Sequence, residues 1–451
     1  MQAMNDKQNF TTGSIPKKMI GFMIPVLGAL ILQSMYSAVD LLIVGKFGST
    51  AGISGVSTGS GIMNMVTFTL AAMTTAVTAM IGRYLGEGRP DKLGILIGGA
   101  ICFFFVAAIV LSMALVAFAR PLALLMQAPA EALDLTVLYI RICGSGFVFV
   151  VFYNFISSIF RGFGDSRMPL VIVAIACVVN IVGDLILVAG FHMDVAGAAI
   201  ATIAAQAISV LMSLVIMVKR GLPFAITKQD FRFSGEVRTF VIAGAPLSLQ
   251  EFLTSISFLA LCAFINRLGL DASSGYGVAQ KIQSFILLLP SSLMQSMTPI
   301  VAQNVGAGRE DRAGSAMKWG MAFGASIGVF VAIAVFFKGD LLSMLFSDDA
   351  AVITRSFEYL RGFALEAVVT SVLFTFMGYF NGHAKTLFVM AQGLAQSFLI
   401  RLPISYVMSI QPEASLTAIG LAAPAATVFG IVICFIYYKR MKRDMIYRNL
   451  V

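Results

Sequence analysis

Long apolar runs, separated by short polar segments, fill almost the whole chain. A run of about 20 apolar residues is long enough to cross the hydrocarbon core of a membrane as an α-helix. The longest polar interruption begins at Lys219 and ends at Arg238, so we expect six helices on either side of it. The apolar runs predict twelve membrane helices, at residues 17–44, 52–82, 93–118, 131–159, 168–190, 195–218, 238–266, 273–304, 313–337, 350–380, 386–409 and 414–438.

The two halves resemble each other at a constant spacing of 220 residues. The recurring pairs are Gly86 and Gly306, Tyr139 and Tyr359, Arg141 and Arg361, Phe160 and Phe380, and Gly162 and Gly382. A fixed spacing of this size indicates a structural repeat. Because six helices return the chain to the side where it started, the two halves are expected to have the same orientation.

These patterns predict an all-α polytopic membrane protein, with twelve transmembrane helices in two parallel six-helix lobes around a central cleft. We expect an amino-terminal lobe with a cation site at residues 1–218 and a cytoplasmic linker loop at 219–237. The carboxy-terminal lobe is expected at residues 238–451.

The composition supports a membrane protein and explains the positive charge. The chain is 59% hydrophobic and 12% charged, with a mean hydropathy of +0.91, whereas soluble proteins contain about 25% charged residues. Of the 31 Lys and Arg, only four fall in the loops on one side of the predicted membrane, namely Lys46, Arg120, Arg267 and Lys338. The positive-inside rule then places both termini in the cytoplasm. The net charge of +9 therefore reflects multi-pass topology in a bacterial-type plasma (inner) membrane, and not nucleic-acid binding.

Two acidic residues of the first half lie deep in apolar segments. Asn180 and Asp184 are four residues apart, which places both on one face of a helix, and Asp40 is a candidate second carboxylate. An ionised carboxylate in such surroundings costs several kcal/mol unless it is paired, hydrated or protonated. Two acids with an amide and hydroxyls suit a hard monovalent cation or a shared proton, and the alternative is a pair of acids satisfied by hydrogen bonds between helices. At the equivalent positions the second half has Leu261 and Ile404.

One polar segment carries a family signature. The sequence R-G-F-G-D-S-R-M-P at residues 161–169 resembles the signature of the multidrug and toxic compound extrusion (MATE) family, and the N-x-x-x-D of residues 180–184 and G-A-A-I-A-T at 197–202 follow in the family's order. The resemblance covers essentially the whole chain. It implies a secondary-active multidrug exporter that antiports amphipathic, often cationic, organic compounds out of the cell against inward Na⁺ or H⁺ through alternating access.

The resemblance also implies a site. It matches a cation-coupling site to four residues, with Na⁺ as one candidate ion, and further residues match more loosely as polar groups that line the lobe. The cation-coupling residues are Asp40, Asn180, Asp184 and Thr202, and the lobe-lining residues are Tyr36, Tyr139 and Asn154. Because Pro25 lies in the same predicted helix as Asp40, bending of that helix is our hypothesis for how cation binding reshapes the substrate cleft.

Charged residues within helices of the second half have several interpretations. Some similar proteins place acids in the seventh and tenth helices, where this chain has Glu251 and Glu366, but neither sits clearly at the family position. Glu251, five residues after Pro246, is a candidate for the substrate path or for a local structural pair. Lys281 and Arg401 either pair with these acids or extend to the membrane edge.

Other functions fit less well. A lipid-linked oligosaccharide flippase on a related scaffold would need a basic cleft for pyrophosphate. An intramembrane hydrolase would need a paired catalytic constellation, and a passive channel does not need duplicated halves with buried acids. The glycine-rich segments lack G-K-[ST], so they are not phosphate loops. We therefore expect no enzyme activity and no cofactor, and a monomer whose partners are membrane lipid and amphipathic drugs.

Overall fold

The computed structural model describes residues 8–220, 226–412 and 414–450. Residues 221–225 of the predicted linker lie outside this part of the chain. The described ranges consist of helices joined by turns and loops, and they contain no strand. The first half forms α1 (Ile15–Phe47), α2 (Thr50–Gly86), α3 (Asp91–Ala117), α4 (Ala119–Leu125), α5 (Leu133–Ser145), α6 (Phe147–Gly162), α7 (Arg167–Asp184), η1 (Leu185–Gly190) and α8 (Asp194–Arg220).

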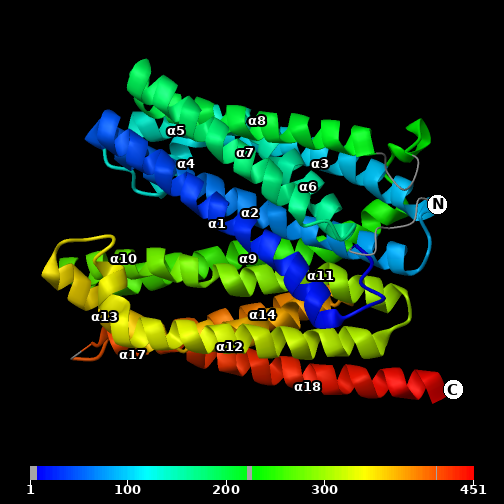
Figure 1. The fold of residues 1–451 in the computed structure, drawn as a ribbon. Helices are drawn as coiled ribbons and strands as arrows, with labels where there is room; N and C mark the ends of the chain where they lie inside the picture. Colours follow the sequence, from blue (N-terminus) through cyan, green and yellow to red (C-terminus); the bar gives the residue numbers. More distant parts are fainter. Residues whose placement is uncertain (1–7, 221–225, 413, 451) are drawn as a thin grey trace. The chain divides into compact units, whose positions relative to one another are not determined.

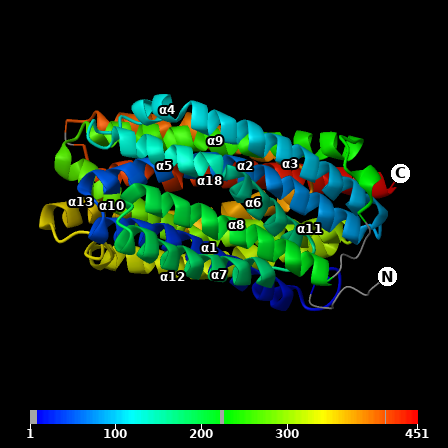
Figure 2. The ribbon, with the colours of Figure 1, turned by 90° about the horizontal axis from the view of Figure 1, so that it is seen from above.

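The second half, after the short turn η2 (Lys228–Asp230), repeats this order. Its elements are α9 (Gly235–Asn266), α10 (Leu270–Ile286), α11 (Leu288–Gly306), α12 (Glu310–Ser343), α13 (Ala350–Phe363), α14 (Glu366–Gly382), α15 (Thr386–Leu394), η3 (Ala395–Arg401), α16 (Leu402–Ser409), α17 (Leu416–Gly420) and α18 (Ala422–Leu450). Figures 1 and 2 show the long helices of each half running along a common direction.

The membrane spans agree with the sequence prediction. Within the described residues, ten helices are long and apolar enough to cross a membrane, and two bent helix pairs raise the number to twelve if each pair is one span. The bent pairs are equivalent in the two halves: α5 and α6 meet at 52°, and α13 and α14 meet at 48°. The predicted all-α polytopic fold is therefore confirmed, and these ten to twelve apolar helices fall where the sequence predicts spans.

The polypeptide divides into two compact units. Unit 1 comprises the described residues of Met1–Gly13, Ile20–Ser248 and Ala302–Arg309, and unit 2 comprises Ser14–Met19, Leu249–Val301 and the described residues of Glu310–Val451. The core of unit 1 contains the stacked rings of Phe104 and Phe240, 6.0 Å apart between centroids. The core of unit 2 contains Tyr276 and Tyr359, whose rings meet edge to face at 5.0 Å. Each unit thus has its own buried core.

The repeated glycines allow the last turns of α2 and α11, both in unit 1, to pack closely together. A Cβ on Gly86, the last residue of α2, would lie 2.1 Å from the backbone oxygen of Gln303 in α11. A Cβ on Gly306, the last residue of α11, would lie 2.2 Å from the backbone oxygen of Arg83. Both residues must be glycine for these backbones to approach so closely. The recurrence of these glycines at a spacing of 220 residues is therefore a packing requirement, not a phosphate site.

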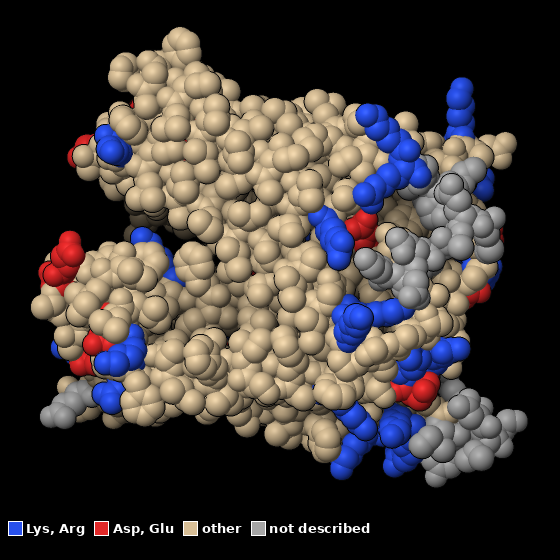
Figure 3. Space-filling view, in the orientation of Figure 1, with Lys and Arg blue, Asp and Glu red and all other residues tan. Residues whose placement is uncertain are grey.

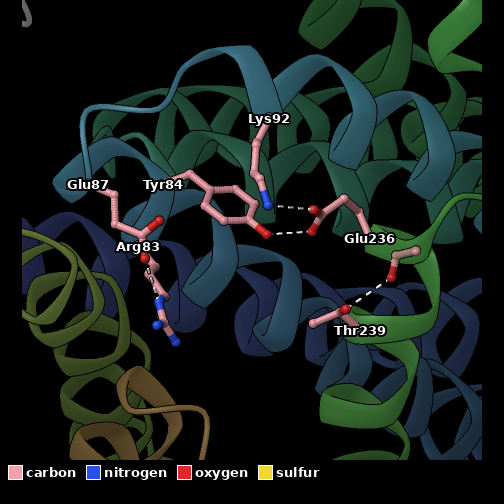
Figure 4. A network of polar contacts seen from close by, with 7 residues as sticks. Arg83, Tyr84, Glu87, Lys92, Glu236 and Thr239 are labelled. Carbon is pink, nitrogen blue, oxygen red and sulfur yellow. Dashed lines mark hydrogen bonds and ion pairs between the residues drawn. The ribbon is translucent and has the colours of Figure 1, made fainter.

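The first turn of α9 is held to α2 and α3 by a carboxylate within unit 1 (Figure 4). Glu236 accepts a hydrogen bond from the hydroxyl of Tyr84 and an ion pair from Lys92 at 3.2 Å. Lys92 also lies over the Tyr84 ring, 5.3 Å from its centroid. The start of the second repeat is thereby anchored to the first one.

On the face drawn in Figure 3, charged side chains gather toward the ends of the helices. In each unit, the face visible in Figure 3 carries its Lys, Arg, Asp and Glu toward the two ends of the helices, and the surface between them is uncharged. Large apolar side chains are exposed on the long helices, including Phe105 of α3 and Phe330 of α12. An apolar surface with charged ends matches the hydrocarbon core and headgroup regions of a bilayer.

Candidate cation site

Three helices of unit 1 bring the predicted site residues together in its interior. Asp40 of α1 is 5% exposed, whereas Asn180 and Asp184 of α7 are completely buried. The hydroxyl of Thr202 in α8 donates a hydrogen bond to Asp40 Oδ2 at 3.2 Å. The carboxyl groups of Asp40 and Asp184 interact electrostatically, and Asn180 lies beside Asp40. The structure therefore joins all four residues of the predicted cation-coupling set.

Small residues make this arrangement possible. A Cβ on Gly183 of α7 would lie 3.0 Å from the Cβ of Ala201 in α8. These two positions directly precede Asp184 and Thr202, so the close approach of the helices also brings the polar side chains together. A Cβ on Gly197 would lie 3.0 Å from the backbone of Leu187, in the π-helical turn η1 that follows Asp184. The predicted G-A-A-I-A-T motif is thus a packing surface for α7 and η1.

Buried polar atoms at this site lack protein partners. Within the described residues, Asp40 Oδ1, both Asp184 oxygens and both amide atoms of Asn180 make no hydrogen bond. Buried polar groups are normally satisfied, and an unpaired buried carboxylate is especially costly. The donor set consists of carboxylate, amide and hydroxyl oxygens, which favour a hard cation such as Na⁺, and either carboxylate can instead take up a proton. The residues present therefore fit the predicted Na⁺ or H⁺ site.

Two tyrosines extend the polar region. Tyr36 is one helical turn before Asp40 and interacts with Asp40, Thr202 and Gln206. Tyr139 of α5 interacts with Asp40 and Tyr36. A Cβ on Gly59 of α2 would lie 2.5 Å from the Tyr139 ring, so this glycine makes room for the ring.

Gln206 is a member of this group that the sequence analysis did not single out. Its Oε1 atom is buried and makes no hydrogen bond within the described part of the chain. It lies four residues after Thr202, one turn further along the same face of α8. The four-residue spacing from Thr202 was the feature of the sequence that could have identified Gln206.

For two other predicted residues, the described part of the chain shows no interaction with the acid pair. The Asn154 amide donates a hydrogen bond to the Val150 carbonyl of its own helix, α6, at 2.9 Å. None of the contacts made by the described residues links Asn154 to Asp40 or Asp184. Glu251 of α9 belongs to unit 2, and among the described residues its carboxylate has neither a hydrogen bond nor an ion pair. The structure therefore gives Glu251 no local structural pair.

Unit 2 has a different buried polar centre. Arg401 is 8% exposed, donates a hydrogen bond to Ser257 and interacts electrostatically with Glu366, which is also 8% exposed. Lys281 is exposed and lies over the Phe346 ring, 5.9 Å from its centroid. Of the two interpretations of Arg401, association with Glu366 holds and extension to the membrane edge does not.

A duplicated bundle of apolar helices with buried ionisable groups is typical of a membrane transporter. Comparison with known proteins gives the particular family. The sequence profile of the MatE family matches residues 25–186 and 246–407, one match in each half. The chain belongs to the MatE family.

Individual relatives cover nearly the whole chain. It is 25% identical to the "Probable multidrug resistance protein YpnP" of Bacillus subtilis, with 96% of each chain covered. It is 21% identical to the "FAD transporter" of Shewanella oneidensis, with 97% of each chain covered. A solved structure described as the outward-facing conformation of a multidrug resistance MATE family transporter superposes with a TM-score of 0.91 at 18% identity, covering 99% of this chain and all of the other. At that identity the structural likeness establishes the fold alone.

Proposed function

We propose that this protein is a secondary-active multidrug exporter that moves amphipathic or cationic organic compounds out of the cell against an inward flow of Na⁺ or H⁺. The observation that carries the proposal is the meeting of Asp40 and Asp184 in a buried site with unpartnered oxygens. Two neighbouring carboxylates repel each other unless a cation or proton neutralises them. Membership of the MatE family and the printed names of its multidrug relatives support the substrate class.

The coupling of cation flow to drug flow follows because cation binding changes which conformation of the site is more stable. With both carboxylates charged, repulsion favours an open, hydrated site, and cation binding allows α1 to pack more tightly on α7 and α8. Pro25 lies within α1, 15 residues before Asp40, and supplies the position where the helix bends. Two conformations with different affinities for the cation are sufficient to couple two flows by alternating access. The transporter acts as a monomer in the plasma membrane, surrounded by lipid, with both termini in the cytoplasm.

The test uses everted membrane vesicles from a host that lacks its own drug pumps. An organic cation dye, a zwitterionic drug and a flavin nucleotide are offered under a Na⁺ gradient alone or a pH gradient alone. We expect gradient-driven uptake of the organic cation, independent of ATP. Asp40→Asn and Asp184→Asn each remove a charged ligand, and the loss of about 1.5–3 kcal/mol should reduce uptake at limiting cation by roughly tenfold or more. Wild-type uptake by both correctly inserted variants would contradict the proposal. If the vesicles took up the flavin nucleotide and neither of the other two compounds, the substrate would be a flavin nucleotide and not an organic cation.

A further inference from the structure

The interior of unit 2 holds one buried carboxylate and one buried guanidinium. Glu366 begins α14, directly after the bend between α13 and α14, and Arg401 ends the π-helical turn η3. Their charges interact electrostatically, at a separation larger than the 4.0 Å of a direct ion pair. A buried charge of either sign needs an opposite charge nearby, so each residue supplies what the other needs.

Neutral groups hold both side chains in place. Thr427 of α18 donates a hydrogen bond to Glu366 Oε1 at 2.8 Å. The Arg401 guanidinium donates to Ser257 Oγ and lies 4.2 Å from the centroid of the Phe258 ring, both in α9. A cation over an aromatic face is stabilised by the ring. Four elements therefore fix the positions of the two charges.

Other titratable groups around this centre do not add a charge. Arg401 interacts with the hydroxyls of Tyr276 in α10 and Tyr359 in α13, besides Glu366. Glu366 interacts with Thr370, Thr427 and Arg401. A tyrosine hydroxyl is neutral at physiological pH. Glu366 and Arg401 thus form a centre in which one negative charge is balanced by one positive charge.

The two repeats differ in a systematic way. Glu366 is equivalent to Gly146 of unit 1, where a Cβ would lie 2.3 Å from Ile203 and no side chain fits. Arg401 is equivalent to Ile181, one residue after Asn180. Unit 1 therefore contains two neighbouring acids without a basic partner among the described residues, whereas Glu366 of unit 2 has an arginine nearby.

We propose that the Arg401 guanidinium is the resident counter-cation of Glu366, so that unit 2 carries permanently the positive charge that unit 1 takes up as an exchangeable ion. This inference deepens the proposed function and rests on it. Arginine keeps its proton in proteins and is covalently tethered. An additional cation beside Glu366 would be repelled by the guanidinium. Glu366 then needs no exchangeable cation, and Arg401 keeps the number of cations bound per chain from rising at this position.

The test is equilibrium binding of Na⁺, with proton release measured in parallel, to the purified full-length protein in lipid nanodiscs. The wild type should bind one cation per chain, and Asp184→Asn should abolish that binding. Arg401→Gln should raise the number from one to two, and adding Glu366→Gln should return it to one. Lys281→Gln, which removes an exposed lysine of the same unit, is the matched control and should leave the number at one.

Two further variants keep the test decisive if Arg401→Gln does not fold. Arg401→Lys retains the positive charge, so it should bind one cation. Glu366→Gln in the otherwise wild-type protein should also bind one cation, because Glu366 contributes no exchangeable site. Loss of a bound cation in Glu366→Gln, or a single cation in a folded Arg401→Gln protein, would overturn the inference. If Asp184→Asn leaves binding unchanged while Arg401→Gln adds a Glu366-dependent site, the proposed function fails, and only the counter-cation role of Arg401 beside Glu366 is supported.

Discussion

At the residue scale, the site in unit 1 depends on oxygen atoms whose positions come from three separate helices. The spacing of Asn180 and Asp184 predicted that they share a helix face, and the structure confirms it by burying both side chains. That Asp40 joins them could be predicted only from family resemblance, because periodicity within one helix does not say which other helix lies beside it. The association of Arg401 with Glu366 stayed undecided in the sequence for the same reason.

The hydroxyl of Thr202 gives the first prediction. Thr202→Val keeps the shape of the side chain but removes both an oxygen ligand and the 3.2 Å hydrogen bond to Asp40. A hydrogen bond to a charged group contributes about 1.5–3 kcal/mol, so the cation concentration for half-maximal transport should rise roughly tenfold to a hundredfold. The measurement is the dependence of drug uptake on Na⁺ or pH in vesicles.

Two matched variants control for general effects of this change. Thr202→Ser retains the hydroxyl and should behave nearly as the wild type. Thr69→Val removes a hydroxyl that bonds only the carbonyl of its own helix, at Met65, and should have no effect on cation dependence. An unchanged cation dependence in Thr202→Val would show that Thr202 is not a ligand.

At the element scale, hydrophobic run length predicted all the membrane spans, but not their internal breaks. The bends between α5 and α6 and between α13 and α14 lie inside predicted spans that contain no proline. The π-helical turn η1 is wholly apolar, whereas η3 contains Gln396, Ser397 and Arg401, and neither contains proline. Such distortions come from packing between helices, which a one-dimensional pattern does not contain. They adjoin Asp184, Glu366 and Arg401, so the least predictable backbone lies beside the buried charges.

The contact between the ends of α2 and α11 gives the second prediction. Gly86→Ala places a methyl group 2.1 Å from the Gln303 backbone oxygen, and Gly306→Ala places one 2.2 Å from that of Arg83. Because the atoms in the way belong to the backbone, the helices must separate, which typically costs about 1–3 kcal/mol. Each substitution should lower the thermal unfolding temperature of the purified protein. Gly61→Ala in α2, where nothing lies within 4 Å of a Cβ, is the control, and equal behaviour of all three variants would contradict the close contact.

At the scale of the whole molecule, the distribution of basic residues predicts the orientation in the membrane. Single cysteines are placed in exposed loops, at Arg89 between α2 and α3 and at Asp348 between α12 and α13, in a background without the five native cysteines. In intact cells a membrane-impermeant maleimide should label Asp348→Cys and not Arg89→Cys, because the positive-inside rule keeps the Arg89 loop in the cytoplasm. Everted vesicles should give the reverse pattern. The same labelling of both loops from one side would contradict the predicted topology.

In the proposed mechanism, the duplicated architecture works as a transporter because its two units differ chemically. The two halves keep equivalent spans, bends and glycine contacts, but their buried charges differ in sign and position. Equivalent scaffolds preserve the mechanical elements for alternating access. An acid pair in one unit and an acid–arginine pair in the other assign ion exchange to unit 1, which is the central claim of the proposed mechanism.

The most direct test of that claim measures both flows at once. Purified protein in liposomes is given an inward cation gradient, and cation influx and efflux of an organic cation are followed in the same sample for the wild type and Asp184→Asn. We predict that wild-type drug efflux is accompanied by a fixed number of cations entering per drug molecule. In Asp184→Asn both flows should disappear together. Continued gradient-driven drug efflux by a folded Asp184→Asn protein, or wild-type efflux without cation entry, would contradict the account.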